Sequence, residues 1–93
     1  MYKELVIKEL AKMLAEYGEV EPVVGSIITF KKDNIETYIS VDYDFSISNY
    51  NDRYQYQLAS RGKISEGFVE NYPMGQSYKT INLLLEAVLK HYK

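Results

Sequence analysis

The segment 35–48 alternates between two kinds of residue over fourteen positions. Because successive side chains of a β-strand point to opposite sides, this alternation predicts a long strand with one buried face and one solvent-facing face. The length of the strand also favours a bulge or bend near Asp42–Asp44. The residues expected to point inward are Ile35, Thr37, Ile39, Val41, Tyr43, Phe45 and Ile47, and those expected to point outward are Glu36, Tyr38, Ser40, Asp42, Asp44, Ser46 and Ser48.

Turn-forming residues separate this strand from other segments with strand-like patterns, which are 23–30, 53–60 and, with a less regular alternation, 64–72. Four-residue turns would place Phe30 opposite Ile35 and Ser48 opposite Arg53. Both registers bring the apolar residues of the first three strands to one face of the sheet, and this agreement supports the pairing. Charged residues and a glycine interrupt the last segment, which is therefore a candidate edge strand.

Apolar residues at helical spacing predict one helix at each end of the chain. The first helix spans 2–17, with Gly18 as its expected left-handed C-cap and 19–22 as a linker. The second helix spans 77–92, with Ser77 as its expected N-cap. The two apolar stripes are Val6, Leu10, Met13, Leu14 and Tyr17, and Ile81, Leu84, Leu85, Val88 and Tyr92.

The elements together predict an α+β fold of the order α-β-β-β-(β)-α, with an antiparallel meander sheet and both helices packed on one face. The chain has 93 residues, so we expect a single domain over 1–93. No apolar run approaches 18 residues and the first residues are charged, so we expect neither a membrane span nor a signal peptide. The expected location is the cytoplasm.

The composition limits the chemistry open to this chain. It has no cysteine, one histidine (His91) and two arginines. No thiolate, metal cluster or nucleophile–base pair can be recognised from residue spacing, so we expect neither an enzyme nor a cofactor. His91 is expected to be a cation that complements the dipole at the end of the last helix.

The net charge of −2 gives duplex nucleic acid little attraction to the chain as a whole. Positive residues do occur at the predicted turn tips, where side chains are usually just solvated. These residues are Lys31, Lys32, Arg53, Arg61 and Lys63.

The solvent-facing side of the predicted sheet is the candidate binding surface. Tyrosine and serine with few lysines are typical of binding surfaces, because tyrosine adds contact area at a low cost in conformational entropy. The same residues also suit a solvated strand that binds nothing. The candidate partner-binding residues are Tyr38, Ser40, Asp42, Asp44, Ser46 and Tyr50, and Ile27, Thr29, Gln55 and Gln57 lie beside them.

Asp42 and Asp44 are two carboxylates on one face, and such pairs can hold a cation or transfer protons. A flat, open sheet supplies neither a coordination cage nor a cleft that excludes water, so we expect no metal site. As a negative patch, the two residues suit basic groups on a protein partner.

These observations predict a small non-enzymatic protein-binding module. Its size and composition suit an inhibitor or adaptor of the phage or mobile-element type, acting by occlusion through the Tyr/Ser/Asp face. Two alternatives remain open. One is single-stranded nucleic acid stacked on the sheet tyrosines, which Asp42 and Asp44 oppose by repelling phosphate. The other is a homodimer closed by the same face.

Overall fold

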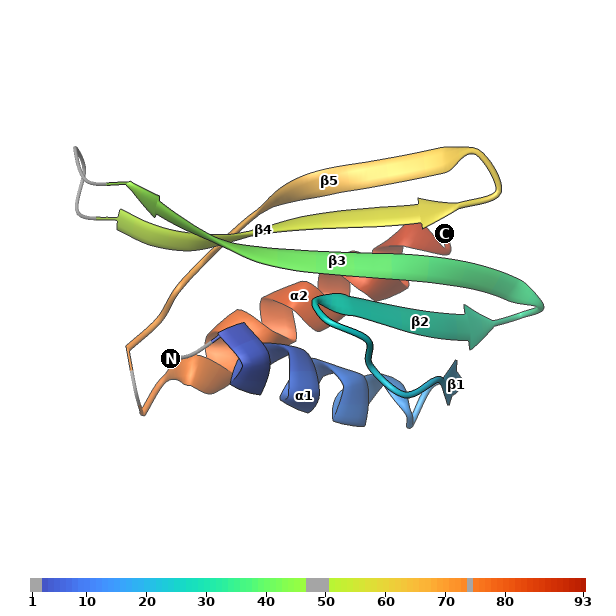
Figure 1. The fold of residues 1–93 in the computed structure, drawn as a ribbon, viewed down its shortest axis with the longest axis horizontal. Helices are drawn as coiled ribbons and strands as arrows, with labels where there is room; N and C mark the ends of the chain where they lie inside the picture. The colour runs from blue at the N-terminus through green and yellow to red at the C-terminus, as the bar shows by residue number, and fades with distance from the viewer. Residues whose placement is uncertain (1–2, 47–50, 74) are drawn as a thin grey trace.

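The computed structural model describes residues 3–46, 51–73 and 75–93. Two helices and five strands follow one another as α1 (Lys3–Leu14), β1 (Glu19–Val20), β2 (Ile27–Lys32), β3 (Ile35–Ser46), β4 (Asn51–Ser60), β5 (Lys63–Glu70) and α2 (Ser77–His91). The strands form one antiparallel sheet in the order β1-β2-β3-β4-β5. Both helices pack against the same side of this sheet and against each other (Figure 1). The predicted α+β meander is confirmed, and the candidate strand at 64–72 is β5.

The first hairpin is two residues out of the predicted register. Phe30 pairs with Thr37 instead of Ile35. The connection is shorter than predicted, because only Asp33 and Asn34 lie between the strands and both have positive φ angles, of 54° and 63°. Two left-handed residues of this kind are typical of a type I′ turn, whose twist matches that of the flanking strands. A shift by an even number leaves every side chain on its predicted face.

The second hairpin is four residues out of the predicted register, because Arg53 pairs with Asp44 instead of Ser48. The inward and outward faces are again unchanged. The pairing of β3 with β4 continues without a break from Tyr38 to Ser46, so the predicted bulge is wrong. The long ribbon instead twists, and Figure 1 shows its two strands crossing near the end of β3.

The segment after α1 differs from the predicted linker at 19–22. It contains β1, in which Val20 pairs with Phe30 of β2. Gly18 does not have a positive φ angle, so the prediction of a left-handed cap is wrong. Glycine is required there for space, since a Cβ at this position would lie 2.9 Å from the Phe30 ring.

Several element boundaries also move. α1 ends at Leu14 instead of Tyr17, and Tyr17, predicted on its apolar stripe, is 45% exposed. β4 begins at Asn51 instead of Arg53.

β2 begins later than predicted because Val24 to Ile27 form a tight turn, in which the Ile27 amide donates to the Val24 carbonyl and Gly25 has a φ angle of 62°. Ser77 is the first residue of α2 rather than its cap. The N-cap position belongs to Gln76, which makes no capping bond with its side chain.

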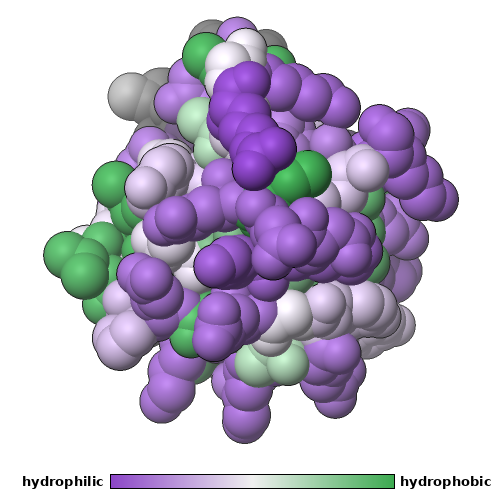
Figure 2. All heavy atoms as spheres, turned by 90° about the vertical axis from the view of Figure 1, so that its right-hand side faces the viewer, coloured by the Kyte–Doolittle hydropathy of each residue, from purple (hydrophilic) through white to green (hydrophobic). Residues whose placement is uncertain are grey.

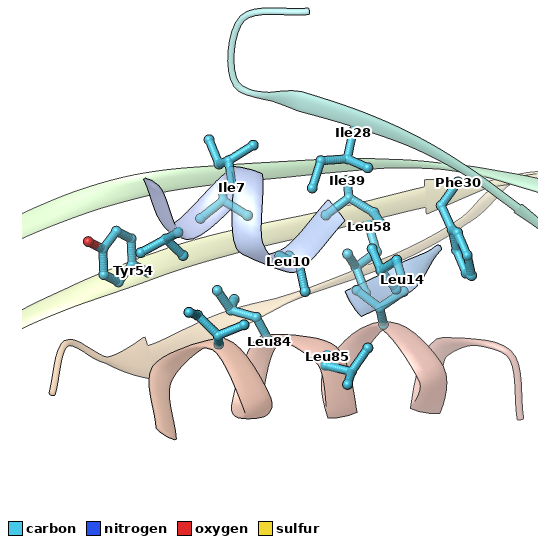
Figure 3. Close-up of a cluster of buried hydrophobic side chains, with 14 of the residues drawn as sticks. Ile7, Leu10, Leu14, Ile28, Phe30, Ile39, Tyr54, Leu58, Leu84 and Leu85 are labelled. Carbon is cyan, nitrogen blue, oxygen red and sulfur yellow. The ribbon is translucent and has the colours of Figure 1, made fainter. Parts of the chain in front are cut away.

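The hydrophobic core lies between the helices and the inner face of the sheet (Figure 3). The helices cover only this face, and no described residues form a second layer over the opposite face, which we call the outer face. In the part of the chain that the structure describes, neither helix is long and apolar enough to cross a membrane. The buried apolar residues are Val6, Ile7, Leu10, Leu14, Ile28, Phe30, Ile39, Val41, Tyr54, Leu58, Val69, Ile81, Leu84, Leu85 and Val88.

Candidate functional site

The outer face carries large apolar side chains that no element of the described chain covers. Tyr38 on β3 lies in one row with Thr29, Ala59 and Ile64, because these residues pair directly across four strands. We call the four large exposed residues of this face the outer apolar set. They are Ile27, Tyr38, Ile64 and Phe68, with exposed fractions of 46%, 51%, 63% and 49%.

The structure places the predicted β3 residues on the outer face, where Tyr38, Ser40, Asp42 and Asp44 alternate with the buried positions of the strand. Ser46 is the last residue of β3. Tyr50, the remaining predicted site residue, lies outside the described residues. The predicted turn at 49–52 is wrong in its second half, because Asn51 and Asp52 belong to β4.

The two predicted carboxylates differ in their surroundings. Asp44 accepts a hydrogen bond of 2.7 Å from Arg53, whose guanidinium lies 3.8 Å above the centre of the Phe68 ring. Asp42 lies 3.6 Å from the ammonium group of Lys3. All of these groups are partly exposed, so each ion pair contributes only about 0–1 kcal/mol to stability. Their main effect is to hold Arg53 flat over Phe68 and to compensate the charge of Asp44.

Tyr38 remains a neutral phenol over a wide pH range. Its hydroxyl donates to the Glu36 carboxylate at 3.3 Å, and the negative charge of Glu36 raises the pKa of Tyr38 above its ordinary value. The ring is therefore available for apolar contact, while the hydroxyl is a hydrogen-bonding group at one edge.

Sequence reasoning missed Ile64 and Phe68, which β5 adds to the outer face. The signal that it could have used is the period of two in Ile64, Glu66, Phe68 and Glu70. Gly67 hid this signal, because a glycine normally interrupts a strand. In the structure Gly67 makes room for a ring on the inner face, since a Cβ there would lie 2.9 Å from Tyr56 Cζ.

A shallow depression of about 140 Å³ lies between members of the outer apolar set. Its polar lining comes from Ser40, Asp42, Gln55, Gln57 and Glu66. Within residues 3–46, 51–73 and 75–93, no three metal-ligating side chains converge. The depression therefore offers hydrogen-bond acceptors and donors to a partner, on a surface open to water.

A second group of polar residues lies where α2 ends. Figure 1 places the β2–β3 turn, the β4–β5 turn and the end of α2 at one end of the molecule, and Figure 2 looks onto this end, where hydrophilic residues dominate. We call it the basic end, after Lys32, Arg61, Lys63 and Lys93.

His91 is buried at this end, with 6% of its surface exposed. Its Nε2 lies 2.7 Å from the Ser60 hydroxyl and its Nδ1 2.8 Å from the Ser65 hydroxyl. Burial, and then the charge of Lys63, lower the pKa of His91 below its ordinary value. The ring is therefore neutral near pH 7, and the predicted cation at this position is wrong.

The contact between Ser60 and His91 is a nucleophile–base pair that residue spacing did not reveal. Both ring nitrogens bond to serine hydroxyls, and no carboxylate of the described residues hydrogen-bonds to the ring. The arrangement ties α2 to β4 and β5. It lacks the acidic group that would orient and charge the histidine for catalysis.

Tyr92 ties the same helix end to the first hairpin. Its hydroxyl donates to the Ile35 carbonyl at 3.2 Å and lies 2.6 Å from the Thr37 hydroxyl. Its ring meets the Phe30 ring edge to face, with 5.8 Å between the centroids. We call His91 and Tyr92 the C-terminal clamp, because together they connect the end of α2 to the β2–β3 hairpin and to the β4–β5 hairpin.

Comparison of the chain with protein-family models, curated proteins and solved structures finds no match. The outer face and the basic end are the features of the described residues that bear on function.

Proposed function

We propose that this protein is a small, non-enzymatic protein-binding module whose partner covers the outer face. The observation that carries the proposal is the outer apolar set, whose four members are each about half exposed on a sheet face without a second layer. Strand pairing places polar Ser40, Gln57 and Glu66 between Phe68 and the row that holds Tyr38 and Ile64, so apolar and polar side chains are mixed over this face. Mixed surfaces of this kind occur at protein interfaces, and each exposed apolar side chain gains free energy when a partner removes it from water.

Charge around the outer apolar set supports a basic partner surface. By strand pairing, acidic residues outnumber basic ones on the outer face, and Asp44 already engages one of the basic residues, Arg53. Complementary charge of this kind raises association rates and rejects acidic surfaces, including phosphate backbones. The outward-facing charged residues of the strands are Glu19, Glu36, Asp42, Asp44, Glu66 and Glu70, against Lys31 and Arg53.

The mode of action that we propose is occlusion by an inhibitor or adaptor of the phage or mobile-element type, in the cytoplasm. Its support is the small size of the chain and the absence of cysteine, which suits a reducing compartment. The outer face can cover a partner surface without any reacting group of its own.

The proposal is tested with a matched pair of tyrosine variants. Tyr38→Ala removes the central ring of the outer face, whereas Tyr78→Ala removes a ring of similar exposure (58%) from α2, on the other side of the sheet. Affinity capture from the source cell, followed by binding measurements with the purified partner, should show about a tenfold or greater loss for Tyr38→Ala. Tyr78→Ala should bind like the wild type.

A folded Tyr38→Ala/Ile64→Ser double variant that captures the partner without loss would refute the proposed face. Light scattering over a concentration series tests the homodimer alternative. A homodimer closed by the outer face would show a molar mass that rises reversibly with concentration, and the same variants would weaken this association. Binding of labelled single-stranded oligonucleotides that weakens with salt would support the nucleic-acid alternative instead.

A further inference from the structure

A surface cavity of about 210 Å³, open to solvent, lies at the basic end between the end of α2 and the β2–β3 and β4–β5 turns. This volume is roughly seven times the ~30 Å³ that a molecule occupies in liquid water, so the cavity can hold a small organic group. Ile35 and the Tyr92 ring supply apolar wall. Arg61, Lys63 and Lys93 supply positive charge.

These three cations have no acidic partner among the described residues. The carboxylate of Asp33 acts on Tyr92, but it is already paired with Lys32 at 2.8 Å. The end of α2 contributes about half a negative charge, and the terminal carboxylate of the tested chain contributes a full one. The three full positive charges outweigh both. Lys63 also donates to the His91 carbonyl at 2.9 Å, and this bond satisfies one of the helix-end acceptors.

One donor at the cavity is held by a hydrogen bond, and a second begins from a fixed backbone position. The bond to His91 fixes the Lys63 ammonium group and leaves two of its three N–H groups for another acceptor. Arg61 lies in the tight β4–β5 turn, with φ angles of 44° at Arg61 and 81° at Gly62. An arginine fork and a neighbouring ammonium group match the oxygens of a phosphate better than those of a neutral group.

We propose that this cavity binds a phosphate-type oxyanion joined to a small apolar or aromatic body. Arg61 and Lys63 hold the oxyanion, and Ile35 and Tyr92 contact the apolar body. Neutral His91 is a positioning residue, because its bonds to Ser60 and Ser65 keep the helix end against the β4–β5 hairpin. The cavity is separate from the outer face, so the two proposals can fail independently.

The test is an amide NMR titration of the full chain at constant ionic strength with phenyl phosphate, inorganic phosphate and phenol. Phenyl phosphate should give saturable shifts at residues 60–63 and 91–93. Inorganic phosphate should bind several-fold more weakly, because it lacks the apolar body, and phenol should not bind measurably.

Arg61→Asn is the decisive variant, since asparagine tolerates the positive φ angle and removes the charge. It should weaken phenyl phosphate binding about tenfold, as expected for one lost charge-assisted contact. Lys63→Gln should have a similar effect. Lys79→Gln, at the first turn of α2, is the matched control and should bind like the wild type.

Well-dispersed spectra of the variants establish that they fold. The proposal is overturned if the amide shifts occur near all the lysines of the chain and do not saturate. It is also overturned if folded Arg61→Asn binds phenyl phosphate with unchanged affinity, or if phenyl phosphate and inorganic phosphate bind with equal affinity.

Discussion

Gly67 and Tyr56 are fitted to each other across β4 and β5. A Cβ on Gly67 would lie 2.6 Å from the Tyr56 hydroxyl and 2.9 Å from its Cζ, and Tyr56 packs against the core. We expect Gly67→Ala to destabilise the protein by about 1–3 kcal/mol, as other overpacked interiors do. Denaturant unfolding would measure this. In a Tyr56→Leu background the same substitution should cost little, and an equal loss there would argue against the steric cause.

His91 should make stability depend on pH. Its pKa is lowered in the folded state, so between that pKa and the ordinary value of 6.5 the unfolded chain binds the proton more readily. The contribution of neutral His91 to stability is thus fully present above about pH 6.5 and is lost as the pH falls below it. Unfolding free energies from about pH 7.5 to about pH 5.5 should fall in the wild type and less in His91→Gln. Parallel curves for the two proteins would contradict this assignment.

At the scale of elements, the β2–β3 turn requires residues that tolerate left-handed backbone. Asn34 has a φ angle of 63°. Alanine in this conformation is disfavoured by roughly 1–2 kcal/mol, whereas glycine adopts it readily. Asn34→Ala should therefore lower the free energy of unfolding by about 1 kcal/mol, and Asn34→Gly should change it little. Thermal or denaturant unfolding of the pair checks this, and a loss of similar size in both variants would point to the asparagine side chain instead.

The strands also show which structural features can be predicted from neighbouring residues in the sequence and which cannot. Alternation in 35–48 predicted correctly that Thr37, Ile39 and Val41 are buried and that the residues between them face outward, because facing depends only on neighbours along the chain. Tyr43 was also predicted to be buried, but 40% of its surface is exposed. The registers were wrong because each depends on how its turn is built, and a two-residue turn with Asp33 and Asn34 both left-handed was not distinguished from a longer one. The prediction of β5 was uncertain because its sequence contains Gly67. The structure requires glycine there to make room for the ring of Tyr56, which lies on β4.

At the scale of the whole molecule, the core holds the helices on one side of the sheet. Leu10 of α1 is fully buried in it, between the sheet and α2 (Figure 3). Leu10→Ala should cost about 2–5 kcal/mol, the usual range for a buried leucine. Leu5→Ala, at a 46% exposed position of the same helix, is the matched control and should cost far less. Similar unfolding midpoints for the two variants would contradict the packing described.

The whole molecule also explains why parts of the candidate sites could not be read from the sequence. The outer apolar set combines β2, β3 and β5, and the last of these strands had no clear pattern. The environment of His91 depends on Ser60 and Ser65, which lie about thirty residues earlier in the chain. Burial of this kind results from tertiary packing, and a lone histidine near a helix end carries no local sign of it.

The C-terminal clamp has a consequence for how the outer face meets other molecules. Because one helix end is fastened to both hairpins, the strands beneath the apolar side chains cannot fan apart or slide without breaking those bonds. The outer face is thus preorganised for a binding partner and does not have to change shape first. Little conformational entropy is therefore lost when the partner binds. Capture should then proceed in one kinetic phase, with a rate set by diffusion and charge.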